Sequence, residues 1–151
     1  MLIRVAQAGD IKVVEALRST ALSASAPSVY SPREVAELLD SLDLDELQAM
    51  VKDRQLFVAE TDGLIIGCAG WRGKHLRHVY VAPDSERGGL GTCLVTRAES
   101  DFRDRTSAGT IYVASVLYAR GFYEKLGYKL ATNERSGSEP FHMKKSFEFA
   151  R

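Results

Sequence analysis

A glycine-rich turn between an apolar strand and a helix is the feature that most restricts how this chain can fold. The turn spans residues 81–92, with the sequence VAPDSERGGLGT, and contains Gly88, Gly89 and Gly91. Glycine has no Cβ, so the backbone there can adopt positive φ and approach a ligand closely. The first turn of the following helix leaves N–H groups without internal partners at the positive end of the helix dipole. The turn therefore predicts an anion site, and a cofactor that carries a pyrophosphate is the leading hypothesis.

Length and charge limit the classes of protein to which the chain can belong. Its 151 residues, 45% of them hydrophobic, suit a single domain over residues 1–151. Twenty basic and twenty acidic residues give a formal charge of zero, which argues against nucleic acid as a partner. The longest apolar stretch, residues 64–71, is too short to span a bilayer, and no signal-like segment opens the sequence. We therefore expect no membrane partner and a cytoplasmic location.

The two cysteines, Cys68 and Cys93, lie in apolar stretches without a CxxC spacing. This pattern favours buried, reduced thiols over a disulfide, a metal site or a catalytic nucleophile. No metal is expected.

The amino-terminal part of the chain reads as one strand followed by helices. Residues 2–6 predict a short strand, and the proline-containing segment 23–30 predicts a loop. Between them, Asp10 can cap a helix whose apolar positions are Val13, Val14, Leu17 and Ala21. The sequence Ser31-Pro32-Arg33-Glu34 combines a capping box with proline at the first helical position. An acidic segment, residues 43–51, is predicted to continue this second helix with a bend.

The rest of the chain alternates strands with two helices. An Asp-Gly pair, Asp62-Gly63, predicts a hairpin turn between strands at 56–60 and 64–71. Further strands are expected at 75–82, 110–114, 128–132 and 141–149, and helices at 90–102 and 118–126. The first of these helices has Leu90, Leu94, Ala98 and Phe102 on one face. We therefore predict an α+β domain whose mixed, largely antiparallel sheet of about six to seven strands has helices on both faces.

These motifs, in this order, resemble the GNAT superfamily of N-acetyltransferases. The family's acyl-CoA motif has Gln or Arg, two free positions, Gly, one free position, then Gly or Ala, after a strand that ends in Val-x-Pro. Here Val81-Ala82-Pro83 and Gly89-Leu90-Gly91 match, whereas Glu86 occupies the Gln/Arg position. A carboxylate facing pyrophosphate would be repulsive, so we expect Glu86 to point to solvent while Arg87 supplies positive charge.

A second motif supports the resemblance, which runs from Ile3 to Glu148. Residues 122–128, FYEKLGY, are similar to the FYEKLGF segment near the carboxyl end of many family members. Alone, each motif would also suit a tight turn or a helix that ends at a glycine. Dinucleotide binding of the Rossmann type fits less well because hairpin strands precede the glycine turn, and the lysine-containing P-loop pattern is absent.

The resemblance implies acetyl transfer from acetyl-CoA, as co-substrate, to the primary amine of a small molecule or peptide by direct attack. It implies that main-chain groups of the turn, and of the strand before it, contact the coenzyme. That strand is expected to splay apart from the strand at 110–114, which leaves its main-chain groups unpaired. The expected cofactor-binding residues are Val79, Tyr80, Val81, Arg87, Gly88, Gly89, Leu90, Gly91, Thr92 and Tyr123.

The same resemblance implies that Tyr123 donates a proton to the leaving thiolate. Its phenol is neutral at physiological pH and can donate a hydrogen bond. The alternative is an aromatic residue that only packs in a short helix.

An amine acceptor must also lose a proton before it attacks, and histidine titrates near neutral pH. On a regular strand His75 shares a face with Val79 and Val81, so it is preferred to His78 as the base. Solvated strand histidines are an equal alternative for both, and His142 is expected only to line the last strand.

The acceptor is not identified by the sequence. The resemblance places its site between segments 23–30 and 133–140, whose charged residues Glu134, Arg135 and Glu139 could bind it or could simply be solvated. Tyr30 and Trp71 could provide aromatic walls, although Trp71 is more typical of a core. The resemblance also allows a homodimer. A second function remains open because of Glu86, namely a GNAT-fold module that binds acyl-CoA without turnover as a sensor or partner domain.

Overall fold

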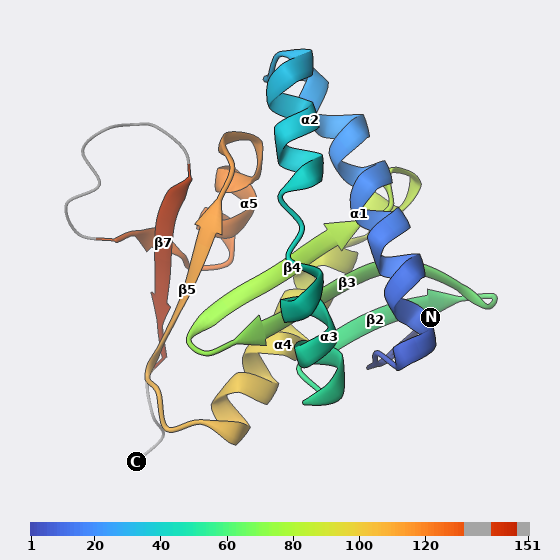
Figure 1. Ribbon diagram of the computed structural model, residues 1–151. Coiled ribbons are helices and arrows are strands. Elements are labelled where there is room, and N and C mark those ends of the chain that lie inside the picture. The colour runs from blue at the N-terminus through green and yellow to red at the C-terminus, as the bar shows by residue number, and fades with distance from the viewer. Residues whose placement is uncertain (132–139, 148–151) are drawn as a thin grey trace.

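The computed structural model describes residues 1–131 and 140–147. One mixed sheet has the spatial order β1-β2-β3-β4-β5-β7-β6 (Figure 1). Its strands are β1 (Leu2–Val5), β2 (Leu56–Thr61), β3 (Leu64–Arg72), β4 (His75–Val81), β5 (Thr110–Ser115), β6 (Lys129–Leu130) and β7 (Phe141–Ser146). The α-helices are α1 (Ile11–Ser25), α2 (Pro32–Asp40), α3 (Leu44–Lys52), α4 (Leu90–Arg105) and α5 (Arg120–Lys125). Short 3-10 turns lie at Ala8–Asp10, Ala26–Ser28, Pro83–Gly88 and Leu117–Ala119. The predicted α+β architecture is confirmed.

The hairpin between β2 and β3 forms where the sequence predicts it. Asp62 and Gly63 both have positive φ, 51° and 78°. This geometry belongs to a two-residue turn whose twist matches that of antiparallel strands, and an Asp-Gly pair adopts it readily. The turn therefore fixes the register in which β2 lies beside β3.

The parallel neighbours β4 and β5 touch only at one end. His75 and Tyr112 form their single registered pair among the described residues, and the Tyr112 N–H donates to the Lys74 carbonyl at 2.8 Å. Beyond this point the two strands diverge, as Figure 1 shows. The splay expected from the family resemblance is therefore present, and β5 continues the sheet through its antiparallel partner β7.

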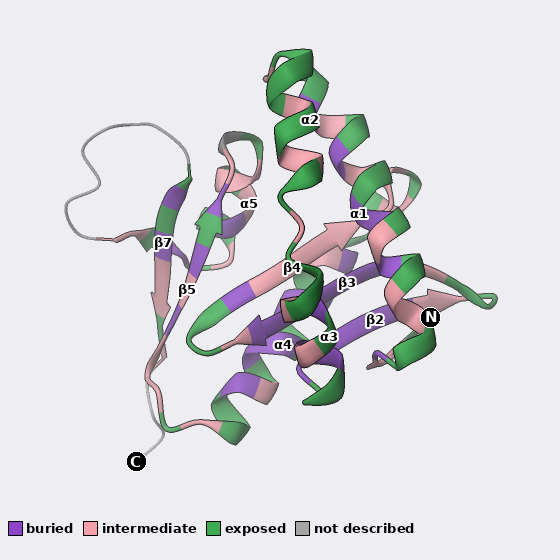
Figure 2. Cartoon of the chain, in the orientation of Figure 1, coloured by how far each residue is buried: buried purple, intermediate pink, exposed green. Residues whose placement is uncertain are grey.

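Each face of the sheet is covered by helices and has its own core (Figure 2). On one face α4 contributes Leu90, Leu94, Ala98 and Phe102, each at most 4% exposed. This apolar stripe was predicted from the four-residue spacing and is confirmed. The opposite face packs α1 and α3 against β2 and β3, in a cluster built from Val14, Leu17, Leu47, Met50, Leu56, Val58 and Cys68. Strand β4 is paired with β3 from His75 to Val81, with one irregularity.

The helix starts follow local capping chemistry, with two differences from the prediction. The capping box forms as expected, since Glu34 N–H donates to Ser31 Oγ at 3.2 Å and Ser31 N–H to Glu34 Oε1 at 3.0 Å. Helix α3 is separate from α2, because the Asp43 carboxylate accepts from Glu46 N–H and starts a new helix. Asp10 precedes α1, but its carboxylate accepts from Gln7 N–H and Arg4 instead of capping that helix.

Several predicted boundaries were wrong. Segment 23–30 is not a loop, because α1 continues to Ser25 and a 3-10 turn starts beside Pro27, which is tolerated in a first turn. Within α1, Val13 is 45% exposed and lies off the packed face. The helix expected at 118–126 divides into a 3-10 turn and α5. The strand expected at 128–132 is only β6, and the end of the one expected at 141–149 lies outside the described residues.

The predictions for Cys68 and Trp71 were correct, whereas the prediction that Cys93 is buried was wrong. Cys68 is buried, and burial raises the pKa of its thiol to about 12. Cys93 is exposed, because it lies one position before Leu94 and off the buried stripe of α4. Trp71 belongs to the core, where its Nε1–H donates to Asp101 at 2.8 Å.

Candidate active site

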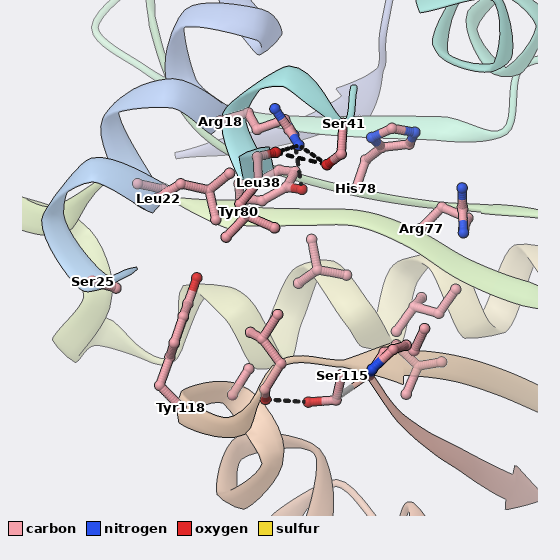
Figure 3. A pocket seen from close by; sticks show the side chains of 18 of the residues that line it. Arg18, Leu22, Ser25, Leu38, Ser41, Arg77, His78, Tyr80, Ser115 and Tyr118 are labelled. Atoms are coloured by element: carbon pink, nitrogen blue, oxygen red, sulfur yellow. Dashed lines mark hydrogen bonds between the residues drawn. The ribbon is translucent and has the colours of Figure 1, made fainter. Parts of the chain in front are cut away.

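A cavity of about 400 Å³ opens where β4 and β5 diverge. Figure 3 looks into it, with α1 and β4 on one side and the end of β5 on the other. Its lining includes four of the residues expected to act on the coenzyme: Val79, Tyr80, Val81 and Tyr123. Its volume lies within the range typical of small-molecule sites, about 300–1,000 Å³. The splay thus creates room for a ligand inside an otherwise continuous sheet.

The start of α4 presents backbone donors a few residues after Glu86, which lines the cavity. The expected coenzyme residues Gly88, Gly89, Leu90, Gly91 and Thr92 do not line the cavity themselves. Gly89 precedes the helix with φ 73° and provides no side-chain cap. The first hydrogen bond of the helix runs from Cys93 N–H to the Gly89 carbonyl, so the N–H groups of residues 90–92 have no acceptor within the helix. A Cβ on Gly91 would lie 3.1 Å from the Phe122 ring and 3.7 Å from Val81 Cγ2. The absence of a side chain there lets α4, α5 and β4 meet closely.

The end of β4 directs further donors into the splay. Ala82 N–H donates to the Ile66 carbonyl on the β3 side, at 2.8 Å. Because successive backbone groups of a strand point in opposite directions, the N–H of Val81, and that of Val79 two residues earlier, face the gap instead. These groups were predicted to meet the pantetheine arm and the carbonyl of a thioester. The separation of β5 leaves them available for such a ligand.

Tyr123 lies on α5 and lines the same cavity. It is 6% exposed, and its ring packs edge-to-face on Tyr128 at 5.6 Å between centroids. Burial raises the pKa of its phenol well above the ordinary value of 10.0, so the hydroxyl stays protonated. That hydroxyl makes no hydrogen bond to any described residue. It is therefore a proton donor whose partner has to come from a ligand or from water.

Glu86 behaves only partly as expected. Its side chain is exposed, as expected, but the residue is also one of those that line the cavity. The side chain of Arg87, the expected source of positive charge, lies outside what the structure describes. The departure from the family motif thus brings a negative charge to the rim of the cavity.

A bulge in β4 overturns the face assigned to His75. Between the pairs Cys68–Tyr80 and Gly70–Arg77, two residues of β4 oppose one of β3. One of them, His78, has φ 56°, a left-handed conformation that is rare outside glycine. The extra residue shifts side-chain alternation by one. Consequently His75 does not share a face with Val79 and Val81; it is exposed, lies outside the cavity and contacts the Tyr112 ring.

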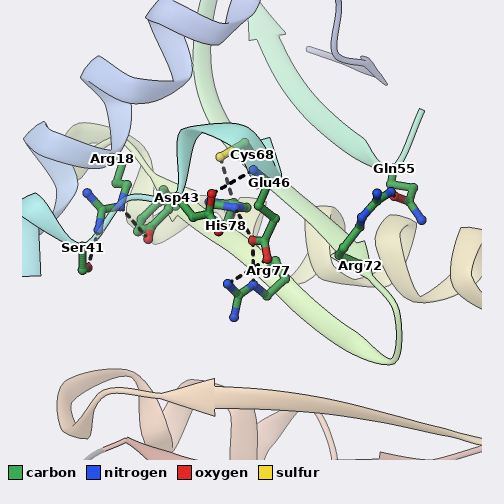
Figure 4. Close-up of polar contacts among 10 residues, drawn as sticks. Arg18, Ser41, Asp43, Glu46, Gln55, Cys68, Arg72, Arg77 and His78 are labelled. Carbon is green, nitrogen blue, oxygen red and sulfur yellow. Dashed lines mark hydrogen bonds and ion pairs between the residues drawn. The ribbon is translucent and has the colours of Figure 1, made fainter. Parts of the chain in front are cut away.

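His78, the second histidine of the strand, lines the cavity and contacts helix α3 (Figure 4). Its Nε2 lies 3.0 Å from Oε1 of Glu46. Arg77 donates to both oxygens of the same carboxylate, from Nε at 2.9 Å and Nη2 at 3.0 Å. Burial lowers the pKa of His78, although Glu46 raises it, so the imidazole is neutral at pH 7. Sequence reasoning missed Glu46, which is 32 residues from His78 and carries no motif.

A buried arginine forms the wall of the cavity on the α1 side. Arg18 is 6% exposed and donates to the carbonyls of Leu38 and Leu39, to Ser41 Oγ, and from Nε to the Tyr80 hydroxyl at 3.2 Å (Figure 3). The carbonyls at the end of α2 carry the negative end of its dipole and so accept a cation well. Arg18 therefore ties α1, α2 and β4 together. No sequence pattern indicates this role, because Arg18 reads as one polar position in an amphipathic helix.

The expected acceptor segments are only partly covered by the described residues. Glu134, Arg135 and Glu139 lie outside them. Tyr30 packs edge-to-face on Tyr118, which lines the cavity. His142 is exposed on β7, opposite Ala114. Among the described residues there is no cluster of three or more metal-ligating side chains, and no helix has the length and apolarity needed to cross a membrane.

Comparison with known proteins places this geometry in a family. The family model for the acetyltransferase (GNAT) domain matches residues 27–147. A blasticidin-S acetyltransferase from Streptomyces morookaense is 31% identical over 75 residues, which are 49% of this chain. The match spans 55% of the length of that relative.

Solved structures share the fold. The PaiA N-acetyltransferase of Thermoplasma acidophilum, in complex with coenzyme A, has a TM-score of 0.78 at 17% identity, covering 97% of this chain and 98% of the other. A GNAT family acetyltransferase of Brucella melitensis, in complex with acetyl-CoA, has a TM-score of 0.65 at 18% identity, covering 99% and 90%. With the family model matching most of its length, the chain belongs to the GNAT acetyltransferase family.

Proposed function

We propose that the protein is an N-acetyltransferase that transfers the acetyl group of acetyl-CoA to an amine. The observation that carries the proposal is that the end of β4 and Tyr123, whose hydroxyl has no hydrogen-bond partner among the described residues, line one cavity. The uncapped start of α4 follows β4 a few residues later in the chain. Family membership supports the reaction class, and the complexes of two structural neighbours with coenzyme A or acetyl-CoA agree with the co-substrate. The acceptor is a small molecule or a peptide.

The backbone provides the binding chemistry for such a co-substrate. The N–H groups of residues 90–92 and the helix dipole of α4 suit the diphosphate, which needs many donors and positive potential. The N–H groups of Val79 and Val81 suit the pantetheine arm and the thioester oxygen. As the amine attacks, that oxygen gains negative charge, and loss of one such donor typically slows catalysis by about 10²–10³-fold.

Tyr123 completes the reaction. When the carbon–sulfur bond breaks, the thiolate of coenzyme A takes the phenol proton, and the amine nitrogen has by then formed the amide bond. Because burial keeps the phenol protonated, Tyr123 can donate over the whole physiological pH range. The nitrogen loses its extra proton to solvent as the amide forms, and the tyrosinate takes one proton back from solvent, so this step is balanced.

Glu86 is predicted to weaken the binding of coenzyme A. Its carboxylate at the cavity rim repels the charges of the diphosphate, and Glu86→Gln removes this repulsion while keeping the shape. We expect the Kd for coenzyme A to fall by about two- to fivefold at low salt, with a smaller gain at high salt because exposed charges are screened. Calorimetric titration at two salt concentrations measures this. An increase in Kd would mean that Glu86 contributes favourably to the site.

The reaction itself is tested by release of free thiol from acetyl-CoA. The assay offers a panel of amines, including polyamines, amino acids, peptides with a free amino terminus and blasticidin S, because of the relative named above. Thermal-shift binding of coenzyme A is measured beside it. Thiol release that depends on an amine supports the enzyme. Binding without thiol release across the panel would instead support a non-catalytic acyl-CoA-binding module, the function that Glu86 keeps open.

A further inference from the structure

The bulge in β4 gives His78 a setting that no other histidine of the described residues has. It holds His78 at positive φ, so that both Arg77 and His78 contact Glu46 on α3. A non-glycine residue in this conformation is strained, and such strain persists only where the surrounding structure enforces it. Here it is enforced by the pairing of β4 with β3 on both sides of the bulge. The strained residue also lines the cavity, as its neighbours on β4 do.

The contact with Glu46 decides which nitrogen of His78 carries the proton. A carboxylate can only accept hydrogen bonds, so Nε2, at 3.0 Å from Oε1, is the protonated nitrogen of the neutral ring. Nδ1 then holds a lone pair. In the described part of the chain Nδ1 has no hydrogen-bond partner, and no fully buried side-chain nitrogen or oxygen there lacks one. Nδ1 is therefore reached by solvent and is open to a ligand or to water.

Charged and titratable groups surround His78 on several elements. Glu46 lies on α3, Arg77 on β4 and Arg18 on α1, while Asp43 lines the same cavity at the start of α3. Cys68 on β3 donates from Sγ to the backbone carbonyl of His78. Tyr80 lies two residues after His78 on β4. Burial and the two arginines favour the neutral imidazole, whereas Glu46 favours the imidazolium. The ring is thus neutral at rest, and Glu46 stabilises the charge that it would gain.

We propose that His78 accepts the proton of the acceptor amine at Nδ1 and that Glu46 positions it for this task; the proposal rests on the acetyltransferase function above. The nitrogen–hydrogen bond of the bound ammonium breaks, its proton moves to Nδ1, and the freed electron pair forms the bond to the acetyl carbon. The imidazolium keeps its Nε2–H bond to Glu46 and later returns the proton to solvent. As the amide forms, the nitrogen loses its second proton to solvent, which replaces the proton that Tyr123 gives to the thiolate. Each turnover therefore releases one proton, the one that His78 returns to solvent.

The test is the pH dependence of kcat/KM for His78→Gln, with the best acceptor found in the amine panel. At pH 7 we expect a loss of about 10²–10⁴-fold for a strongly basic amine, the usual contribution of a general base. The rate of the variant should depend on the fraction of the amine that is already neutral in solution. Its log kcat/KM should therefore rise with pH, with unit slope, up to the pKa of the amine. A weakly basic amine, neutral at pH 7, should lose only a few-fold.

Two further variants separate this role from a structural one. His75→Gln changes the exposed histidine of the same strand and should leave the profile unchanged. Glu46→Gln removes the carboxylate that raises the pKa of His78, so the acidic limb of kcat/KM should move to lower pH. This shift can be measured even if His78→Gln does not fold. Thermal-shift binding of coenzyme A verifies the folding of each variant.

Each remaining outcome counts against a definite part of the account. The role of His78 is overturned if His78→Gln keeps the wild-type rate and the acidic limb of the pH profile. It is also overturned if the acidic limb of Glu46→Gln stays at the wild-type pH. Either result leaves the acetyltransferase function intact. A wild-type protein that binds coenzyme A but releases no thiol with any amine overturns both proposals.

Discussion

Replacing Tyr123 with phenylalanine is expected to lower kcat for acetyl transfer by about 10²–10⁴-fold, the usual range for loss of a general acid. The KM for acetyl-CoA should change little, because the ring remains in the cavity wall and only the hydroxyl is lost. That hydroxyl bonds to no described residue, so the melting temperature should also stay close to that of the wild type. Thiol release at saturating substrates gives kcat directly.

Tyr128→Phe is the matched control for this variant. The two rings are in contact, but the Tyr128 hydroxyl donates to the buried carboxylate of Glu99 at 2.7 Å, on α4 and outside the cavity. Its loss should cost about 1–2 kcal/mol of unfolding free energy and leave kcat within a few-fold. If Tyr123→Phe reduced kcat less than a few-fold, Tyr123 would be a packing residue and water would protonate the thiolate.

Gly89→Asp should weaken the binding of coenzyme A by about 10–50-fold, because it places a carboxylate beside the diphosphate site. Gly89 has φ 73°, a conformation that Asp and Asn adopt more readily than other side chains, and a Cβ added there would meet no atom within 4 Å. The backbone can therefore keep its course. Calorimetric titration with coenzyme A measures the change, which should shrink as salt increases.

Gly89→Asn isolates the charge, since Asn and Asp have the same size and the same backbone preference. We expect its Kd for coenzyme A to stay within about threefold of the wild type. Equal losses in the two variants would show that the backbone of the turn was disturbed. Equal Kd values for Gly89→Asp and the wild type would mean that the diphosphate binds away from the start of α4.

Features of the fold that depend on neighbouring residues were predictable from the sequence. The capping box at Ser31, the Asp62-Gly63 hairpin and the apolar stripe of α4 each depend on contacts within a few residues, and all three are confirmed. The glycine turn was also located correctly, because positive φ at Gly89 and an uncapped helix follow from local chemistry. The family resemblance added the splay between β4 and β5, which no local pattern signals.

The features that the sequence did not predict depend on contacts between distant segments. The bulge at His78 arises from the pairing of β4 with β3, and it reverses the face on which His75 was expected. Glu46 and Arg18 reach the site from helices that are far from β4 in the sequence. Cys93 illustrates the same limit, because its apolar neighbours belong to the buried stripe of α4 whereas Cys93 faces outward.

The central claim is that the diphosphate and pantetheine of coenzyme A bind the backbone at the start of α4 and the end of β4. The most direct measurement is a backbone amide NMR titration with coenzyme A. We expect the largest chemical-shift changes on the N–H groups of residues 89–92 and of Val79 and Val81. Saturation with coenzyme A that leaves these signals in place while amides elsewhere move would contradict it.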